Sequence, residues 1–225
     1  MHADSLGARQ MFDGVARRYD ILNTLGSLGL HKRWRRSALR FCPPAGRALD
    51  LCTGTADWAI NLESRCRMVV GIDFSAQMLA VARLKTRRCR STRLLMGDAM
   101  RLPFRDSSFD LVTIGFSLRN MPALLRFFTE AARVLKPGGR FVSLELTRPS
   151  WEPLRRLHRW YLLLVVPALG TISRRGAYCY LARSILDFPS PGAIAGVMGQ
   201  AGFSQARHLP LTGGMATVHV GIIDH

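Results

Sequence analysis

RALDLCTGTADW, residues 47–58, is the stretch that decides the fold of this chain. An apolar run passes through Asp50 into small residues at 53–56, and a helix-like segment follows. Small residues allow a ligand to approach the backbone closely, and a helix N-terminus offers unpaired N–H groups. We therefore interpret the stretch as a buried strand, a ligand-binding turn and a helix.

A second strand-like run ends in Asp73, about 20 residues after the turn, which is the spacing of a nucleoside-binding α/β domain. The turn contains Thr-Gly-Thr-Ala and lacks the Gly-x-Gly-x-x-Gly pattern of dinucleotide sites. A nucleoside is therefore the expected ligand, and a dinucleotide is not.

Strand-like and helix-like segments alternate through the first two thirds of the chain, which predicts βαβ units on a parallel sheet. Ser75 is the expected N-cap of the second helix, and residues 136–139 are expected to stop the third helix and form a turn. Strands are expected at 48–52, 68–73, 93–96, 111–116 and 140–146, and helices at 57–64, 75–88 and 124–135.

The C-terminal part differs from this alternation. A mainly helical insertion at 151–186 precedes a helix at 191–201, which Gly202 is expected to end. Two strands, 207–211 and 216–223, flank Thr-Gly-Gly and predict an antiparallel hairpin at the sheet edge.

The length of 225 residues and 48% hydrophobic content predict one domain with a sizeable core. We divide it into a helical N-terminal lid, an α/β ligand-binding core, a helical substrate-side insertion, and a C-terminal helix with the edge hairpin. These parts span residues 1–45, 46–146, 147–190 and 191–225.

The formal charge of +17 comes almost entirely from arginine. It has three interpretations: genome composition without a function, nucleic-acid binding, or attraction to an anionic membrane. The chain has no known nucleic-acid motif, and net charge alone argues for solubility and non-specific binding, so we do not expect a nucleic-acid partner. Five cysteines without a CxxC pair, together with the absence of an apolar leader in residues 1–10, predict a reducing, cytoplasmic location.

The apolar segment 160–169 is shorter than the roughly 20 residues that span a bilayer, and Pro167 interrupts it. We expect a core or lid helix there. The alternative is a surface that meets lipid or a lipid-like substrate, because Arg155, Arg156 and Arg159 flank its aromatic start.

Polar residues follow the expected strands at their carboxyl ends, where open α/β sheets bind ligands. Asp73 is placed to accept hydrogen bonds from ribose hydroxyls, although it could instead cap the next helix. Asp98 and Ala99 are placed to contact adenine, or to form only a turn. Arg119 and Asn120 are placed to touch a reacting substrate, although the arginine could instead pair with a structural acid.

Four stretches of the chain resemble the ubiquinone/menaquinone biosynthesis C-methyltransferase family. The spacing Tyr-Asp…Asn…Ser…His…Trp, joined to Leu-Arg-Asn, is the most particular part of the resemblance, whereas Pro-Gly-Gly occurs in many methyltransferases. The stretches are residues 12–34, 53–57, 115–120, and 133–141 with Glu145.

The resemblance implies a seven-stranded, Rossmann-like class I S-adenosylmethionine-dependent methyltransferase fold, with an antiparallel last strand and a helical N-terminal lid. S-adenosyl-L-methionine would be the methyl donor and S-adenosyl-L-homocysteine the product. A serine that often contacts the cofactor in this family is replaced here by Gly115. The expected cofactor-binding residues are Thr55, Asp73, Asp98 and Ala99, with Gly54 and Asp50 in the turn.

The acceptor in this family is a ring carbon of a prenylated quinol. Arg119 and Asn120 are the candidates for polarising its hydroxyl group, and Tyr19 and Asp20 are candidates from the lid. Arginine stays protonated, so stabilisation of developing phenolate charge is its expected role. His31 also belongs to the lid motif, but a lone histidine in a basic amphipathic helix is more often structural.

Demethylmenaquinol is the expected acceptor, because the Cys-x-Gly-Thr-Ala-Asp-Trp motif resembles that of family members of the menaquinone type. The alternatives are a ubiquinone-pathway benzoquinol, another lipophilic phenol, and, from a different class, a methyltransferase-fold protein that binds or modifies RNA. A prenylated quinol lies in the bilayer, so we expect peripheral contact with the inner face of an anionic cytoplasmic membrane. A homodimer is a further expectation.

Overall fold

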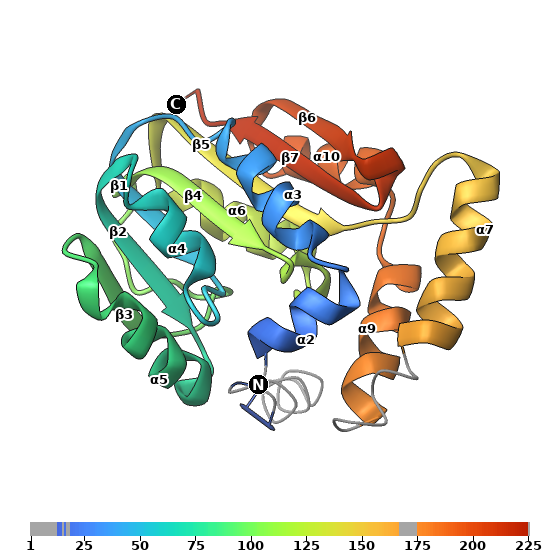
Figure 1. The fold of residues 1–225 in the computed structure, drawn as a ribbon. Coiled ribbons are helices and arrows are strands. Elements are labelled where there is room, and N and C mark those ends of the chain that lie inside the picture. Colours follow the sequence, from blue (N-terminus) through green and yellow to red (C-terminus); the bar gives the residue numbers. More distant parts are fainter. Residues whose placement is uncertain (1–12, 15, 17–18, 167–174, 225) are drawn as a thin grey trace.

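The computed structural model describes residues 13–14, 16, 19–166 and 175–224. Its centre is a seven-stranded sheet in the order β3-β2-β1-β4-β5-β7-β6 (Figure 1). The first five strands are parallel, and β7 lies antiparallel between β5 and β6. This confirms the expected class I methyltransferase sheet with its edge hairpin. The strands are β1 Ala45–Leu51, β2 Cys66–Asp73, β3 Thr92–Met96, β4 Phe109–Gly115, β5 Leu135–Leu146, β6 Ser204–Leu211 and β7 Ala216–Ile222.

Helices cover both faces of the sheet and bury two separate hydrophobic clusters. On one face, α3, α4 and α5 enclose Trp34 and Trp58. On the other face, α6 and α10 (Figure 1) enclose Phe127, Phe128 and Phe203, and the ring of Phe128 packs edge to face with the other two. The helices are α3 Leu30–Leu39, α4 Asp57–Leu62, α5 Ala76–Lys85, α6 Leu124–Val134 and α10 Pro191–Gln200.

A third group of helices lies beyond the carboxyl ends of the parallel strands, where the site is expected (Figure 1). They are α2 Tyr19–Gly26, α7 Glu152–Trp160, the π-helical turn η4 Tyr161–Val165, and α9 Arg175–Asp187. Residues 1–12 of the expected lid lie outside the described residues, as does the Pro167 interruption. No helix of the described ranges is long and apolar enough to cross a membrane.

Several element bounds differ from the sequence expectations. The first strand begins earlier, at Ala45, and Cys52 leaves it with a φ of 51°. The second helix ends at Lys85 and continues as a short 3-10 turn, η2 Thr86–Arg88. The first helix ends at Leu62, two residues before the expected bound.

Residues 136–139 were expected to stop the third helix and form a turn; the helix stop is confirmed, since α6 ends at Val134, but the separate turn was wrong. They belong to β5 as a bulge, between the pairs that join β4 to Leu135 and to Arg140. The reason is tertiary pairing: Gly138 N–H donates to Ile223 O at 2.6 Å, and Ile223 N–H donates to Gly139 O at 3.0 Å. The turn conformation survives only locally, in the φ of +75° at Gly138.

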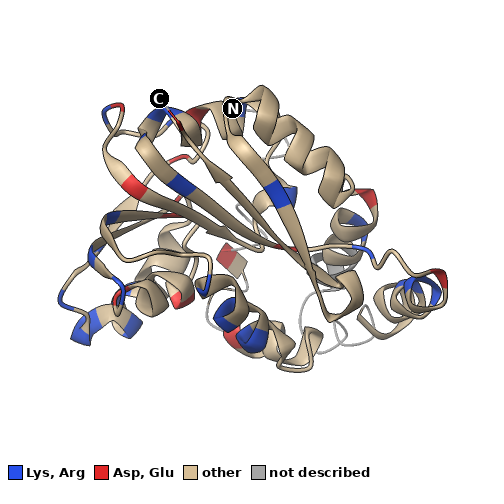
Figure 2. Ribbon diagram, turned by 90° about the horizontal axis from the view of Figure 1, so that it is seen from above, with Lys and Arg blue, Asp and Glu red and all other residues tan. Residues whose placement is uncertain are grey.

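Other local expectations are confirmed. Ser75 caps α5, since its hydroxyl accepts from Met78 N–H at 3.1 Å, and Gly202 ends α10 with a φ of +94°. The Thr212–Gly214 turn η6 joins β6 to β7. Four cysteines are free thiols in the described part of the chain, and Cys179 lies outside the described side chains. Lys and Arg are scattered over the whole ribbon, without gathering on one face (Figure 2).

Candidate functional site

In the turn after β1, every second residue from 52 to 56 has a left-handed backbone conformation, which residues other than glycine rarely adopt. Cys52, Gly54 and Ala56 have φ values of 51°, 56° and 65°. For a residue other than glycine this left-handed conformation costs about 1–2 kcal/mol, and such strain gathers at functional sites. At the carboxyl end of the sheet, the N–H groups of Thr53, Gly54 and Ala56 already donate within the protein.

Asp73, the last residue of β2, anchors this turn. Its Oδ2 accepts from Gly54 N–H at 2.8 Å, and its Oδ1 accepts from Ser75 N–H at 2.9 Å. Burial raises the pKa of this carboxyl group, and the two backbone hydrogen bonds oppose the rise. A carboxylate has about four lone-pair sites, so acceptor capacity remains for the hydroxyl groups of a ligand.

Asp50 lies beneath the turn, within the sheet. Its two oxygens accept from the hydroxyls of Thr53 at 2.6 Å and Thr113 at 2.8 Å. Burial raises the pKa of Asp50 to about 6, although both hydrogen bonds lower it. The carboxyl group therefore braces the turn from inside and joins β1 to β4.

A charged cluster ties α2 to the same turn. Thr55 Oγ1 donates to Asp20 Oδ1 at 2.7 Å. Lys85 Nζ donates to Asp20 Oδ2 at 2.7 Å, to Thr55 Oγ1 at 3.1 Å, and also to Asp57. The cavity against the turn measures about 20 Å³, and α2 closes on the turn through the contact between Asp20 and Thr55.

Asp98 and Ala99 follow β3 at the same edge of the sheet. Asp98 is exposed, and its Oδ1 accepts from Met100 N–H at 2.8 Å, whereas Ala99 is buried. Neither residue is among the described residues that line the small cavity. Their proposed contacts with adenine stay a prediction.

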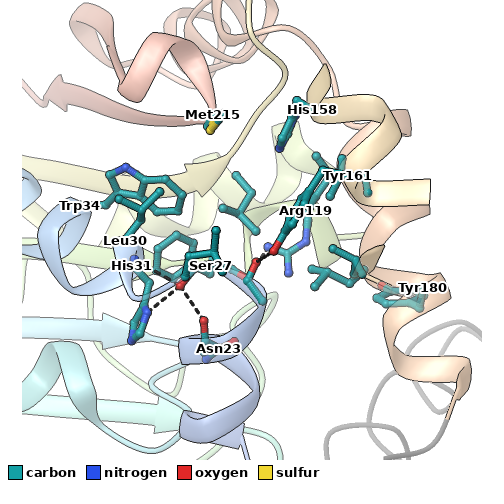
Figure 3. Close-up of a pocket in the computed structure, with 18 of the residues that line it drawn as sticks. Asn23, Ser27, Leu30, His31, Trp34, Arg119, His158, Tyr161, Tyr180 and Met215 are labelled. Atoms are coloured by element: carbon teal, nitrogen blue, oxygen red, sulfur yellow. Dashed lines mark hydrogen bonds between the residues drawn. The ribbon is translucent and has the colours of Figure 1, made fainter. Parts of the chain in front are cut away.

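A larger cavity of about 400 Å³ lies between α2, α3 and the insertion (Figure 3). Its lining is mainly aliphatic and aromatic. Tyr19 lines both cavities, and the consecutive residues Gly115 and Phe116, at the end of β4, line the small and the large cavity respectively. The two sites therefore adjoin each other. Residues that surround the large cavity include Leu28, Leu30, Trp34, Leu157, Leu162 and Ile185.

Arg119 both lines the large cavity and pairs with a buried acid. Its Nη1 donates to Glu145 Oε1 at 2.5 Å and to Phe116 O at 2.6 Å, and its Nε donates to Ser184 Oγ at 3.1 Å. The Glu145 side chain has no exposed surface, and that of Arg119 is 7% exposed. Among the described residues Nη2 has no hydrogen-bond partner, so its donors remain for a ligand. The pairing with a structural acid is therefore confirmed, and contact with a reacting substrate stays a prediction.

Asn120 lies beside the large cavity and is not among the described residues that line it. Its Oδ1 accepts from the Tyr180 hydroxyl at 3.0 Å, and Tyr180 does line the cavity. Tyr161, from η4, reaches across to donate to Gly26 O at 3.1 Å (Figure 3). Two tyrosines of the insertion therefore fasten it to the lid and to the turn after β4.

His31 and His158 bring imidazole groups to the cavity, and burial lowers the pKa of both. Ser27 Oγ donates to Asn23 O at 2.6 Å, and its single hydrogen is thereby used. The 2.8 Å contact between Ser27 Oγ and His31 Nδ1 must then have the imidazole as donor (Figure 3). Burial lowers the pKa of His31 and so favours its neutral form, in which a proton on Nδ1 leaves Nε2 as an acceptor.

The structure thus brings Gly54 to Asp73, and Thr55 to Asp20, across long stretches of sequence. Sequence reasoning missed Lys85, because a lysine in the last turn of a helix gives no functional signal. It also missed the tyrosines of the insertion, which follow no motif.

Comparison with known proteins gives consistent results. The model of the ubiE/COQ5 methyltransferase family matches residues 1–223. A ubiquinone/menaquinone biosynthesis C-methyltransferase UbiE from Geobacter sp. (strain M21) is 43% identical over 95% of this chain and 94% of its own. A demethylmenaquinone methyltransferase from Staphylococcus saprophyticus is 39% identical over 94% of each chain.

Solved structures show the same fold at lower identity. A Thermotoga maritima S-adenosylmethionine-dependent methyltransferase, described as a possible histamine N-methyltransferase, has a TM-score of 0.72 at 20% identity. The match covers 95% of this chain and 98% of that one.

Proposed function

The chain belongs to the ubiE/COQ5 methyltransferase family, and from this premise we propose that it methylates a ring carbon of a prenylated quinol, with demethylmenaquinol as the acceptor. The membership makes it an S-adenosylmethionine-dependent C-methyltransferase. The proposal concerns the acceptor and the residues that act on it.

The observation that supports the acceptor most strongly is the large cavity. Its 400 Å³ and its apolar lining suit an aromatic ring with the first part of an isoprenoid tail. It adjoins the cofactor turn through Tyr19, and Arg119 brings one permanently charged donor group into it. A hydroxyl on an otherwise apolar ring matches this combination.

The residues around the strained turn fit the cofactor. Gly54 has the left-handed φ that a close backbone approach requires, and Asp73 has unused acceptor capacity beside it. When bound, S-adenosylmethionine supplies a methyl group on a cationic sulfur and leaves as S-adenosylhomocysteine. We assign Asp73 to the ribose hydroxyls, Asp98 and Ala99 to adenine, and Thr55 to the closure of the lid.

The chain must align the acceptor, exclude water and manage two protons. Loss of the hydroxyl proton makes the ring carbon more nucleophilic, and the ring C–H proton leaves after the new carbon–carbon bond forms. Arg119 Nη2 stabilises the developing phenolate charge. Asn120 positions Tyr180 at the cavity wall, and Asp20 holds the lid closed through Thr55 and Lys85.

A ubiquinone-pathway benzoquinol is the second candidate acceptor. The relative from Geobacter, whose name includes both pathways, supports it. The test is a competition assay in which purified protein receives labelled S-adenosylmethionine with equal amounts of short-tail demethylmenaquinol and demethylated benzoquinol. We expect most label on the naphthoquinol, and equal or opposite labelling would contradict our choice of acceptor.

We also propose that the rim of the large cavity rests on an anionic membrane. Leu28, in the turn after α2, is 77% exposed, and Leu157 and Trp160 of α7 are each 66% exposed. Leu28 and Leu157 also line the cavity, so the apolar rim and the tail entrance coincide. Of the nearby arginines, Arg155 and Arg156 pair with Glu152, and Arg159 would contribute about 1 kcal/mol near such a surface.

Co-sedimentation with liposomes tests this placement. Binding should rise with the fraction of anionic lipid at low salt, and Leu157→Glu with Trp160→Glu should abolish it. Binding that ignores lipid charge, or that survives both substitutions, would contradict the proposed surface.

A further inference from the structure

Trp58 contains a buried polar group that the proposed function leaves unused. Its side chain is 4% exposed and lines the small cavity at the turn. Within the described part of the chain, its Nε1–H has no hydrogen-bond partner. Trp34 shows the usual situation, since its Nε1–H donates to Thr212 Oγ1 at 2.8 Å. A buried donor without an acceptor is costly, which points to a ligand atom as the missing partner.

The end of β4 fixes the position of this indole. A Cβ atom placed on Gly115 would lie 2.5 Å from Trp58 Cε3, which is far inside van der Waals contact. The missing side chain at 115 therefore makes room for the ring, and Trp58 and Gly115 form a matched pair. The indole is held at the point where the two cavities adjoin.

The charges around the small cavity identify the kind of acceptor. Arg35 Nη1 donates to Asp57 Oδ2 at 2.8 Å, with the arginine side chain 11% exposed, and Lys85 bridges Asp57 to Asp20. Arg35 and Asp57 therefore lie side by side in the lining of the small cavity, and Lys85 connects this pair to Asp20 on α2. This pattern suits a zwitterion, whose ammonium group faces the acids and whose carboxylate faces the arginine.

We propose that Trp58 Nε1–H donates to the carboxylate of the methionine part of the cofactor, beside the Arg35 guanidinium. An indole N–H can only donate, and a carboxylate is the strongest acceptor that the cofactor offers. Asp73 then receives the ribose on the other side of the turn. The inference rests on the cofactor site proposed above and does not depend on the identity of the acceptor.

Calorimetry with two product-like ligands tests the assignment. S-adenosylhomocysteine contains the carboxylate, whereas 5′-methylthioadenosine lacks both the carboxylate and the amine. Trp58→Phe keeps an aromatic ring and removes the N–H, so it should weaken S-adenosylhomocysteine binding about 10-fold or more and leave 5′-methylthioadenosine binding unchanged. An equal loss for both ligands, or no loss for either, would overturn the inference.

A measurement on the unsubstituted protein covers the case in which the variant fails to fold. In a ¹H–¹⁵N spectrum, the Trp58 indole proton should move downfield with S-adenosylhomocysteine and stay in place with 5′-methylthioadenosine. The same response to both ligands would overturn this inference and leave the proposed cofactor site standing. Failure of the unsubstituted protein to bind S-adenosylhomocysteine would overturn the cofactor site together with it.

Discussion

Arg119→Ala removes the cation that pairs with Glu145, whose side chain has no exposed surface. Breaking a buried pair by deleting one partner costs about 3–5 kcal/mol. The backbone N–H groups of Arg119 and Leu146 still donate to Glu145, at 3.0 and 2.8 Å. We therefore expect the lower end, about 3 kcal/mol. For a chain of this size, Tm should fall by about 6–12 °C.

Turnover should fall as well, because the substitution removes the proposed contact between Arg119 Nη2 and the acceptor. Adding Glu145→Gln separates the two effects, since a neutral amide removes the unpaired buried charge. The double variant should recover most of the Tm while its methyl transfer stays low, with unchanged S-adenosylhomocysteine affinity. Calorimetric melting and a labelled-methyl assay measure both. An unchanged Tm in the single variant, or restored turnover in the double variant, would refute the reasoning.

Three further substitutions test other parts of the account. Asp73→Ala should weaken S-adenosylhomocysteine binding by about 1.5–3 kcal/mol, and unchanged calorimetric affinity would remove Asp73 from the site. Burial raises the pKa of Asp50 to about 6 from 3.8, so the folded state binds this proton more tightly than the unfolded state. The protonated carboxyl group therefore contributes about 3 kcal/mol to the free energy of unfolding. This contribution is fully present below pH 4 and is lost as pH rises through 6. In urea unfolding, the Asp50→Asn variant should not lose this stability as pH rises. An identical pH profile in the variant and in the unsubstituted protein would contradict the prediction. Tyr161→Phe removes the hydrogen bond to Gly26 and should raise the KM for the quinol without changing cofactor affinity; weaker binding of both would point to a general loss of structure.

Local sequence signals predicted the sheet and the turn after β1 well. The Thr-Gly-Thr-Ala turn, Asp73 at the end of the next strand and Ser75 as a cap all depend on residues near in sequence, and their chemistry leaves few alternatives. The edge hairpin was predicted for the same reason, because Thr-Gly-Gly between two apolar runs is a strong short-range signal.

Tertiary partners decided the features that the sequence did not predict. Lys136–Gly139 looked like a turn, but the far end of the chain pairs with it and extends β5. Arg119 looked like either a substrate contact or a structural ion-pair partner. It is half of a buried pair and also lines the large cavity. Lys85, at the end of α5, forms ion pairs with both Asp20 and Asp57. These residues are far apart in the sequence, so no local pattern predicts the contacts.

The position of the transferred methyl group tests the central claim most directly. Purified protein would receive S-adenosylmethionine with a ¹³C-labelled methyl group and short-tail demethylmenaquinol, and the product would be examined by NMR. We predict a single labelled methyl group on a ring carbon of the quinol. Label on a hydroxyl oxygen, or no transfer to any prenylated quinol, would contradict the account.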